Sequence, residues 1–289
     1  MAVIETQNCT VCYSAGTPFE REALTDVSVS IEEGDFVGII GHTGSGKSTF
    51  VQLLNGLIKP TSGRILLDGK DIWENPKDIR RVRFQVGMVF QYPEHQLFEE
   101  TVYKDIAFGP RNMGLSESEI RDCVYRAASM VGLKEELLEK SPFDLSGGEK
   151  RRAAIAGVMA MQPRVLILDE PTAGLDPRGR NLLLQQIRAY KDENNCTVLL
   201  VSHSMEDVAR VADHVLVLNG GTVAMQETTA RIFSRARELE ELGLSVPAVT
   251  RIMAALREAG VPVPDCVYTV EQAKRALLPL LKGGTTRVV

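Results

Sequence analysis

The chain has 289 residues, 44% of them hydrophobic, which suffices for one large domain or for one domain with a small appendage. Its net charge is −5 and its basic residues are dispersed among acids, so the composition disfavours a nucleic-acid-binding protein. Its start lacks the features of a secretion signal, and no stretch approaches the ~18 apolar residues of a membrane-spanning helix. We therefore expect a soluble or peripheral protein, and five cysteines, an odd number, indicate reduced thiols in the cytoplasm.

The first 35 residues predict two strands joined by residues 14–22. Val27–Ile31 alternates between apolar and polar residues, as in a half-exposed antiparallel strand. Tyr13 lies in the first of these strands. Its ring either stacks on a nucleotide base or is an ordinary strand tyrosine, and the sequence leaves both interpretations open.

The residues after the buried strand Phe36–Ile40 predict a phosphate-binding loop. They follow the pattern G-x-x-x-x-G-K-S and are Gly41, His42, Thr43, Gly44, Ser45, Gly46, Lys47 and Ser48. Glycines let backbone N–H groups surround phosphates, and the helix predicted at Thr49–Leu54 adds its positive dipole end. Lys47 is expected to point its charge toward the β- and γ-phosphates, and Ser48 to offer a hydroxyl to Mg²⁺.

The next hundred residues change from β structure to helix. A hairpin turn is predicted at Asp68–Gly69, and a buried strand over residues 86–90 ends at Gln91, whose amide suits contact with Mg²⁺ or water. Residues from about 92 to 160 have a helical pattern, so we predict a helical subdomain inserted into a nucleotide-binding core. The loop at residues 94–98 has apolar content that suits docking of a partner.

A second glycine motif, Leu145–Glu149, opens a helix predicted to continue through Met161. Ser146, Gly147 and Gly148 form a backbone cradle at its N-terminus. The phosphate-binding loop of this chain needs no second cradle, which suggests a phosphate supplied by another molecule. A helix start with flexible glycines explains the motif equally well.

Two further strands deliver polar side chains at their ends. The apolar run at residues 164–168 leads into Asp169, which would hold Mg²⁺ through its water shell, and Glu170, which could activate the attacking water as a general base. The strand Thr197–Val201 leads to His203, placed to reach a γ-phosphate from the carboxyl edge of such a sheet. The sequence thus predicts that the catalytic groups converge at one sheet edge.

The composition shifts again near the end of the chain. Apolar residues recur at helical spacing from Val249 to Leu256, and Thr269–Gln272 has the pattern of a helix cap. We interpret residues from about 231 to 282 as a small helical appendage that provides an interaction surface. The tail from Lys282 to Val289 is expected to be frayed.

The order of these motifs resembles the ATP-binding cassette (ABC) ATPases over roughly residues 1–230. The resemblance implies an α/β fold, a P-loop NTPase core with an antiparallel β subdomain and a helical subdomain at about 92–160. Residues 231–289 would be a C-terminal helical appendage for dimerisation or interaction. ATP and Mg²⁺ are the implied ligands.

The roles of the family carry over residue by residue. The loop from Gly41 to Ser48 would bind phosphates. Glu170 would be the catalytic carboxylate, and His203 would contact the γ-phosphate. Further nucleotide contacts are implied for Gln91, Ser146, Gly147, Gly148 and Asp176, and metal contacts for Ser48, Gln91 and Asp169. The cradle at Ser146–Gly148 would serve ATP held by a partner ATPase.

Finer matches at Gly16–Glu20, Phe90–Thr101 and Arg151–Val158 resemble the energy-coupling factor importers, which take up vitamins and transition-metal ions. The second ATPase subunit of their energising module is the most similar. This resemblance implies a peripheral ATP hydrolase at the cytoplasmic face of the cell membrane, paired as a heterodimer with a second ABC ATPase and working with transmembrane scaffold and substrate-binding membrane subunits. Glu149 departs from the commoner glutamine. The alternative is the ATPase of an exporter or of a binding-protein-dependent importer.

Overall fold

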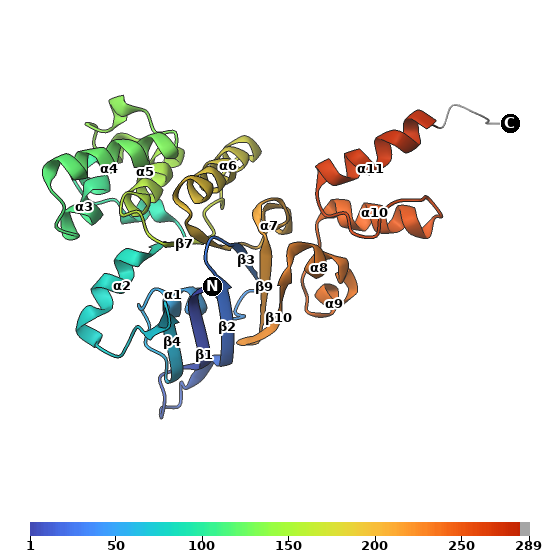
Figure 1. Cartoon of the computed structure of the whole chain (residues 1–289), viewed down its shortest axis with the longest axis horizontal. Helices are drawn as coiled ribbons and strands as arrows, with labels where there is room; N and C mark the ends of the chain where they lie inside the picture. Colours follow the sequence, from blue (N-terminus) through green and yellow to red (C-terminus); the bar gives the residue numbers. More distant parts are fainter. Residues whose placement is uncertain (284–289) are drawn as a thin grey trace.

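The computed structural model describes residues 1–283 and combines two β-sheets with helices on several sides (Figure 1). The helices α3, α4 and α5 gather at one end of the view, the strands lie in the middle, and the last helices extend on the opposite side. Among the described residues, no helix is long and apolar enough to cross a membrane.

An antiparallel sheet is built mainly from the start of the chain. Its four strands run in the order β2-β1-β4-β5. Their bounds are Ala2–Tyr13 for β1, Arg21–Glu32 for β2, Ser62–Leu67 for β4 and Lys70–Asp71 for β5. Buried and exposed residues alternate along the second half of β2, as the sequence predicted, and the predicted turn at Asp68–Gly69 joins β4 to β5.

A second sheet forms the centre of the molecule. Its six strands run in the order β10-β9-β3-β8-β7-β6, and all neighbouring pairs are parallel except β10 with β9. The bounds are Phe36–Ile40 for β3, Val86–Val89 for β6, Val165–Asp169 for β7, Thr197–Val201 for β8, His214–Asn219 for β9 and Thr222–Thr228 for β10. β3, β6, β7 and β8 are buried along their whole length, which explains their continuous apolar runs.

The helix α1, Lys47–Leu54, packs in the core between the two sheets. Phe50, Val51, Leu53 and Leu54 are buried in one cluster with side chains from both sheets. The helix begins at Lys47 rather than Thr49, and Asn55 caps it with Gly56 following at φ 68°. The core on this side of the central sheet therefore fixes the position of the loop that precedes α1. Helix α2, Ile79–Gln85, leads into β6.

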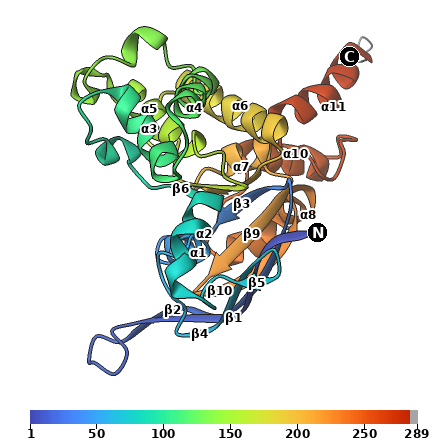
Figure 2. The same ribbon diagram turned by 60° about the vertical axis from the view of Figure 1, so that its left-hand side comes forward.

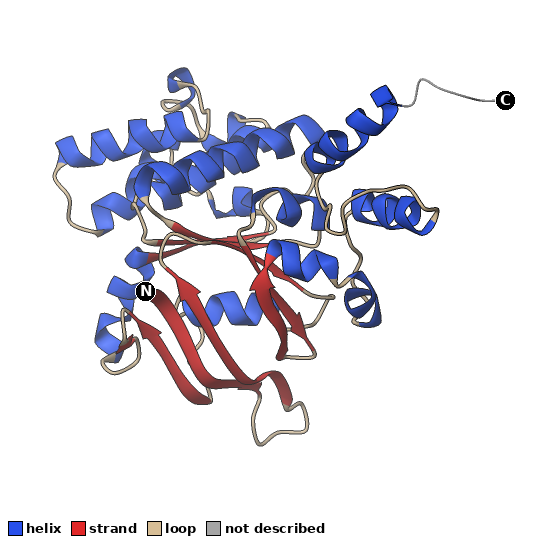
Figure 3. Cartoon of the chain, turned by 45° about the vertical axis from the view of Figure 1, so that its right-hand side comes forward, coloured by secondary structure: helices blue, strands red, loops and turns tan. Residues whose placement is uncertain are grey.

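The opposite face of the central sheet carries the helical region (Figure 3). Its helices are α3 at Val102–Asn112, α4 at Glu117–Met130 and α5 at Gly147–Met159, with α6 at Pro177–Asn194 and α7 at Met205–Val211 following between strands. The helix after the second glycine motif ends at Met159 rather than Met161. α6 begins at Pro177, which occupies its first turn, and the Asp176 side chain caps it.

The last helices form two packing groups. Helices α8, Thr229–Ser234, and α9, Ala236–Glu241, contribute to a cluster with Ile40 and β9, whereas α10, Ala248–Glu258, and α11, Val270–Gly283, share a small cluster of their own. The division of the chain at residue 230 stays a prediction. The expectation of a frayed tail is wrong for Lys282 and Gly283, which continue α11, and residues 284–289 lie outside the described part of the chain.

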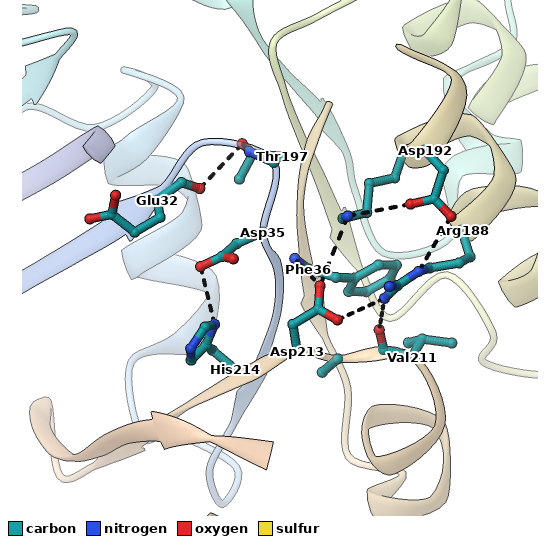
Figure 4. Close-up of polar contacts among 12 residues, drawn as sticks. Glu32, Asp35, Phe36, Arg188, Asp192, Thr197, Val211, Asp213 and His214 are labelled. Carbon is teal, nitrogen blue, oxygen red and sulfur yellow. Dashed lines mark hydrogen bonds and ion pairs between the residues drawn. The ribbon is translucent and has the colours of Figure 1, made fainter. Parts of the chain in front are cut away.

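At the amino ends of the parallel strands, polar side chains form hydrogen bonds and ion pairs with one another and with nearby backbone groups (Figure 4). Arg188 of α6 donates to the Asp213 carboxylate at 3.0 Å and to the Val211 carbonyl at 2.8 Å. The Asp213 carboxylate also accepts from the backbone N–H of Phe36 at 3.1 Å. These contacts tie α6 to the starts of β3 and β9.

Candidate nucleotide site

The turn between β3 and α1, two elements labelled in Figure 2, is the candidate phosphate cradle. Gly44 and Gly46 have φ of 82° and 101°, a region that favours glycine. A Cβ on Gly41 would lie 2.3 Å from the Leu218 carbonyl oxygen, and one on Gly46 would lie 2.7 Å from that of Ala23. No side chain caps α1, so its first N–H groups are available to an anion.

Lys47 holds its ammonium group over this turn. Its Nζ donates to the carbonyls of Gly41 at 2.7 Å and His42 at 2.9 Å. Burial lowers the pKa of Lys47, while the nearby carboxylates of Glu170 and Asp169 act in the opposite direction. Backbone carbonyls rather than a carboxylate thus accept the hydrogen bonds of this cation, and a phosphate can replace them.

The remaining loop residues have different surroundings. His42 lies on the loop's outer side, with Nδ1 2.8 Å from the Thr43 carbonyl and Nε2 3.0 Å from the Asn219 side-chain oxygen. Ser45 is fully buried, and its hydroxyl has no hydrogen-bond partner in the described part of the chain. Ser45 therefore packs inside the loop, and the prediction that it binds phosphate rests on its backbone.

The end of β7 brings a carboxylate to the first turn of α1. Asp169 is 6% exposed; its burial raises the pKa of the carboxyl, and a hydrogen bond with Ser48 opposes that shift. A hydroxyl beside a carboxylate fits Mg²⁺, which takes one or two protein oxygens and completes its shell with water and phosphate. Ser48 and Asp169 are thus the pair that could hold the metal.

Glu170 and His203 meet at the same sheet edge. The His203 Nδ1 lies 2.6 Å from Glu170 Oε2; the histidine side chain is 74% exposed and the glutamate 12%. They come together because β7 and β8 are parallel neighbours, and the Glu170 N–H also donates to the Val201 carbonyl. Glu170 has φ 53°, an unfavourable conformation for a non-glycine residue that is common at functional sites.

The other predicted site residues have surroundings of their own. Gln91 is exposed after β6. Ser146 caps α5 in a capping box with Glu149, ahead of Gly147 and Gly148, and Asp176 caps α6 by accepting from Gly179 at 2.7 Å. None of these lines the pocket over the phosphate-binding loop. Their nucleotide contacts stay predictions.

The pocket over the loop includes residues that sequence reasoning left open or missed. Tyr13, Arg21 and Thr49 line it together with Gly44, Lys47 and Ser48. The Tyr13 hydroxyl lies 3.3 Å from Thr49 Oγ1. Arg21 reaches the pocket because it pairs with Tyr13 across the hairpin. The predicted hairpin was the signal that could have identified Arg21.

A strand–loop–helix cradle with a lysine, a paired serine and aspartate and an adjacent glutamate is characteristic of a P-loop ATPase. The ABC transporter family matches residues 24–173. The energy-coupling factor transporter ATP-binding protein EcfA2 of Caldanaerobacter subterraneus is 52% identical over 97% of this chain and 98% of its own length, and EcfA2 of Symbiobacterium thermophilum is 53% identical over 94% of each chain.

Solved structures of ABC ATPase cassettes are similar to this chain in fold. The structure of cbiO1 from Clostridium perfringens, described as part of the ABC transporter complex cbiONQ, superposes with a TM-score of 0.75 at 38% identity, covering 88% of this chain and 99% of cbiO1. The ABC cassette MJ0796, in a dimeric post-hydrolysis state bound to ADP and Pi, has a TM-score of 0.71 at 29% identity and covers 78% of this chain and 98% of its own.

The chain belongs to the ABC transporter ATPases and, within them, to the energy-coupling factor transporter ATP-binding proteins of the EcfA2 type. The predictions of the α/β ABC ATPase fold, of ATP-hydrolysing activity and of this family are confirmed.

Proposed function

We propose that the protein binds ATP with Mg²⁺ and hydrolyses it to energise an energy-coupling factor importer for vitamins or transition-metal ions. One observation carries the chemistry: Lys47, Asp169, Glu170 and His203 converge at one edge of the central sheet, beside the cradle before α1. The charge of the triphosphate would meet Lys47 and the free N–H groups of α1. The pocket lined by Tyr13 and Arg21 leaves room for the nucleoside next to them.

Glu170 would orient and deprotonate the attacking water. Its carboxylate is largely buried and contacts His203, so it is held in one direction, and a carboxylate of this kind serves as a general base. His203 is exposed enough to reach the γ-phosphate through its free Nε2. Mg²⁺ bound near Ser48 and Asp169 would neutralise phosphate charge. Gln91 would join this site from the end of β6.

We further propose that two ATPase chains sandwich each nucleotide, in a heterodimer with a second ABC ATPase. Ser146–Gly148 would contact ATP held by the partner, because this cradle lies at the start of α5 and away from the chain's own pocket. Asp176 would lie at the same junction. Within the predicted appendage after residue 230, α10 and α11 would add to the dimer surface.

A groove beside α5 suits a membrane-embedded scaffold subunit. It is lined by apolar residues of α3 and α5 and by Gln96, Leu97 and Phe98. Phe98 and Phe108 are 60% and 45% exposed and pack edge to face, with ring centroids 5.0 Å apart. An exposed aromatic pair in a groove marks a site of protein contact. Docking there would place the chain peripherally at the cytoplasmic face of the membrane, with a substrate-binding membrane subunit completing the importer.

Affinity purification from detergent-solubilised native membranes tests this function. We expect a second ABC ATPase, a multi-span scaffold and small membrane proteins to co-purify, and the small proteins to indicate the transported substrates. Recovery with a dedicated exporter or with a periplasmic-type binding protein would support the alternative transporter class. Recovery with ribosomes or nucleic acid would overturn the transport function.

A further inference from the structure

A buried arginine connects three parts of the chain that the proposed function uses separately. Arg151 lies on α5 with only 7% of its side chain exposed. Its Nε donates to Glu94 Oε2 at 3.1 Å and its Nη2 to Glu94 Oε1 at 2.8 Å, a two-point contact with one carboxylate. Its Nη1 donates to the backbone carbonyls of Pro171 and Ala173. Each nitrogen of the guanidinium therefore donates at least one hydrogen bond, which fixes the orientation of the group.

One end of this link lies at the groove. Glu94 belongs to the short 3-10 helix Pro93–Gln96, which follows Gln91, and Gln96 and Leu97 line the groove directly. The opposite wall comes from α5 itself, through Ala153, Ala154 and Gly157. A molecule bound in the groove would thus contact the segment that contains Glu94.

The other end of the link lies at the catalytic edge. Pro171 directly follows Glu170, and the Ala173 N–H donates back to the Glu170 carbonyl at 3.2 Å. Thr172 between them is buried and donates to Asp207 of α7 at 2.9 Å. The segment after the catalytic carboxylate is therefore held from one side by α7 and from the other by Arg151.

We propose that Arg151, held by Glu94, is a positioning residue that couples the occupant of the groove to the placement of Glu170. If the 3-10 helix shifts, the guanidinium either moves with Glu94 or loses its two-point contact with that carboxylate. If the guanidinium moves, its hydrogen bonds to the carbonyls of Pro171 and Ala173 change. The two sites thus share one rigid connection between elements that can move. This inference rests on the proposed docking of a membrane subunit in the groove.

The test compares ATP hydrolysis by the complete membrane complex with hydrolysis by the pair of ATPase chains without the membrane subunits. The readout is the ratio of the two rates, and melting temperatures of both samples show whether a loss of stability accounts for a change in it. Glu94→Gln keeps the side chain's shape and removes its charge, and Arg151→Lys keeps a charge but loses the fork. We expect each to lower the ratio about tenfold, and the double variant to lower it no further than either single variant.

Arg188→Gln is the matched control. Arg188 also joins a carboxylate to a backbone carbonyl, but at the amino ends of the parallel strands (Figure 4). We expect this variant to keep the wild-type ratio. Melting temperatures and co-purification of the membrane subunits accompany each measurement.

The possible outcomes distinguish a failure of the coupling role of Arg151 from a failure of the proposed function. If the wild-type chain assembles no membrane complex, the proposed function fails and the inference with it. If Glu94→Gln assembles normally and keeps the wild-type ratio, the coupling role is wrong while the function stands. If Glu94→Gln no longer co-purifies, Glu94 acts in docking itself, which also overturns the coupling role.

Discussion

The two edges of the central sheet differ in how their polar groups are satisfied. At the amino edge, Arg188 and Asp213 satisfy each other and nearby backbone groups, and the Thr197 hydroxyl accepts from the Gly34 N–H at 2.9 Å. At the carboxyl edge, the Lys47 ammonium donates to backbone carbonyls, and Glu170 has a left-handed backbone.

This contrast separates groups that hold the fold together from groups kept ready for a ligand. At the amino edge, Arg188 and Asp213 are paired within the chain, so these side chains contribute to stability. The carboxyl edge leaves a cation, helix N–H groups and carboxylates close together with incomplete partners. Protein sites commonly trade local stability for such readiness.

The largest effect is expected at Glu170. Glu170→Gln removes the carboxylate that would accept the proton of the attacking water, and we expect ATP turnover to fall by about 10²- to 10⁴-fold. ATP binding should persist, because Lys47 and the loop are untouched. Phosphate release by the assembled complex measures turnover, and equilibrium binding of a labelled nucleotide is the control. Unchanged turnover would show that another group activates water.

A smaller effect is expected at Lys47. Lys47→Met retains the apolar stem and removes the charge, and we expect ATP affinity to fall by about 10- to 100-fold, the range of a charge-assisted hydrogen bond. The free energy of unfolding should not fall, because the variant no longer buries an ammonium held only by carbonyls. Calorimetric titration with ATP and denaturant unfolding give the two quantities. A matching loss of both would mean that Lys47 supports the fold instead.

The residues at the carboxyl edge of the central sheet could be predicted from the sequence because they lie in contiguous motifs. The strand before Gly41, the apolar run before Asp169 and the strand before His203 each fix the position of a side chain through parallel pairing alone. Glu94 and Arg151 are 57 residues apart, and Arg188 and Asp213 are 25 apart, so their contacts depend on tertiary packing. The start of α6 is an exception among tertiary features, because Asp176 followed by Pro177 is a local signal for a helix start.

A modest effect on stability alone is expected at the amino edge. Arg188→Gln removes the ion pair with Asp213 and a hydrogen bond to Val211. Since its side chain is 39% exposed and water screens the pair, we expect a loss of about 1 kcal/mol. ATP turnover should stay at the wild-type value. Urea unfolding and phosphate release check the two statements. A loss of turnover with intact stability would contradict the division between the two edges.

The smallest effect is a pH dependence at Glu94. Burial works to raise the pKa of this carboxyl, but the hydrogen bonds and charge of Arg151 prevail and lower it. A carboxyl whose pKa is lower in the folded state stabilises the fold above its unfolded pKa, and this contribution disappears as the pH falls through the folded pKa. The stability difference between the wild type and Glu94→Gln should therefore shrink on acidification.

For the buried Asp105, we expect the stability contribution to change with pH in the opposite direction. Its carboxylate accepts from the backbone N–H groups of Phe98 and Glu99, yet burial prevails and raises its pKa. Acidification through the raised pKa toward the unfolded value should stabilise the wild type relative to Asp105→Asn. Urea unfolding of both variants over the acid range compares the two trends. The same trend for both carboxyls would mean that Arg151 does not compensate the burial of Glu94, and the link across α5 would lose its electrostatic basis.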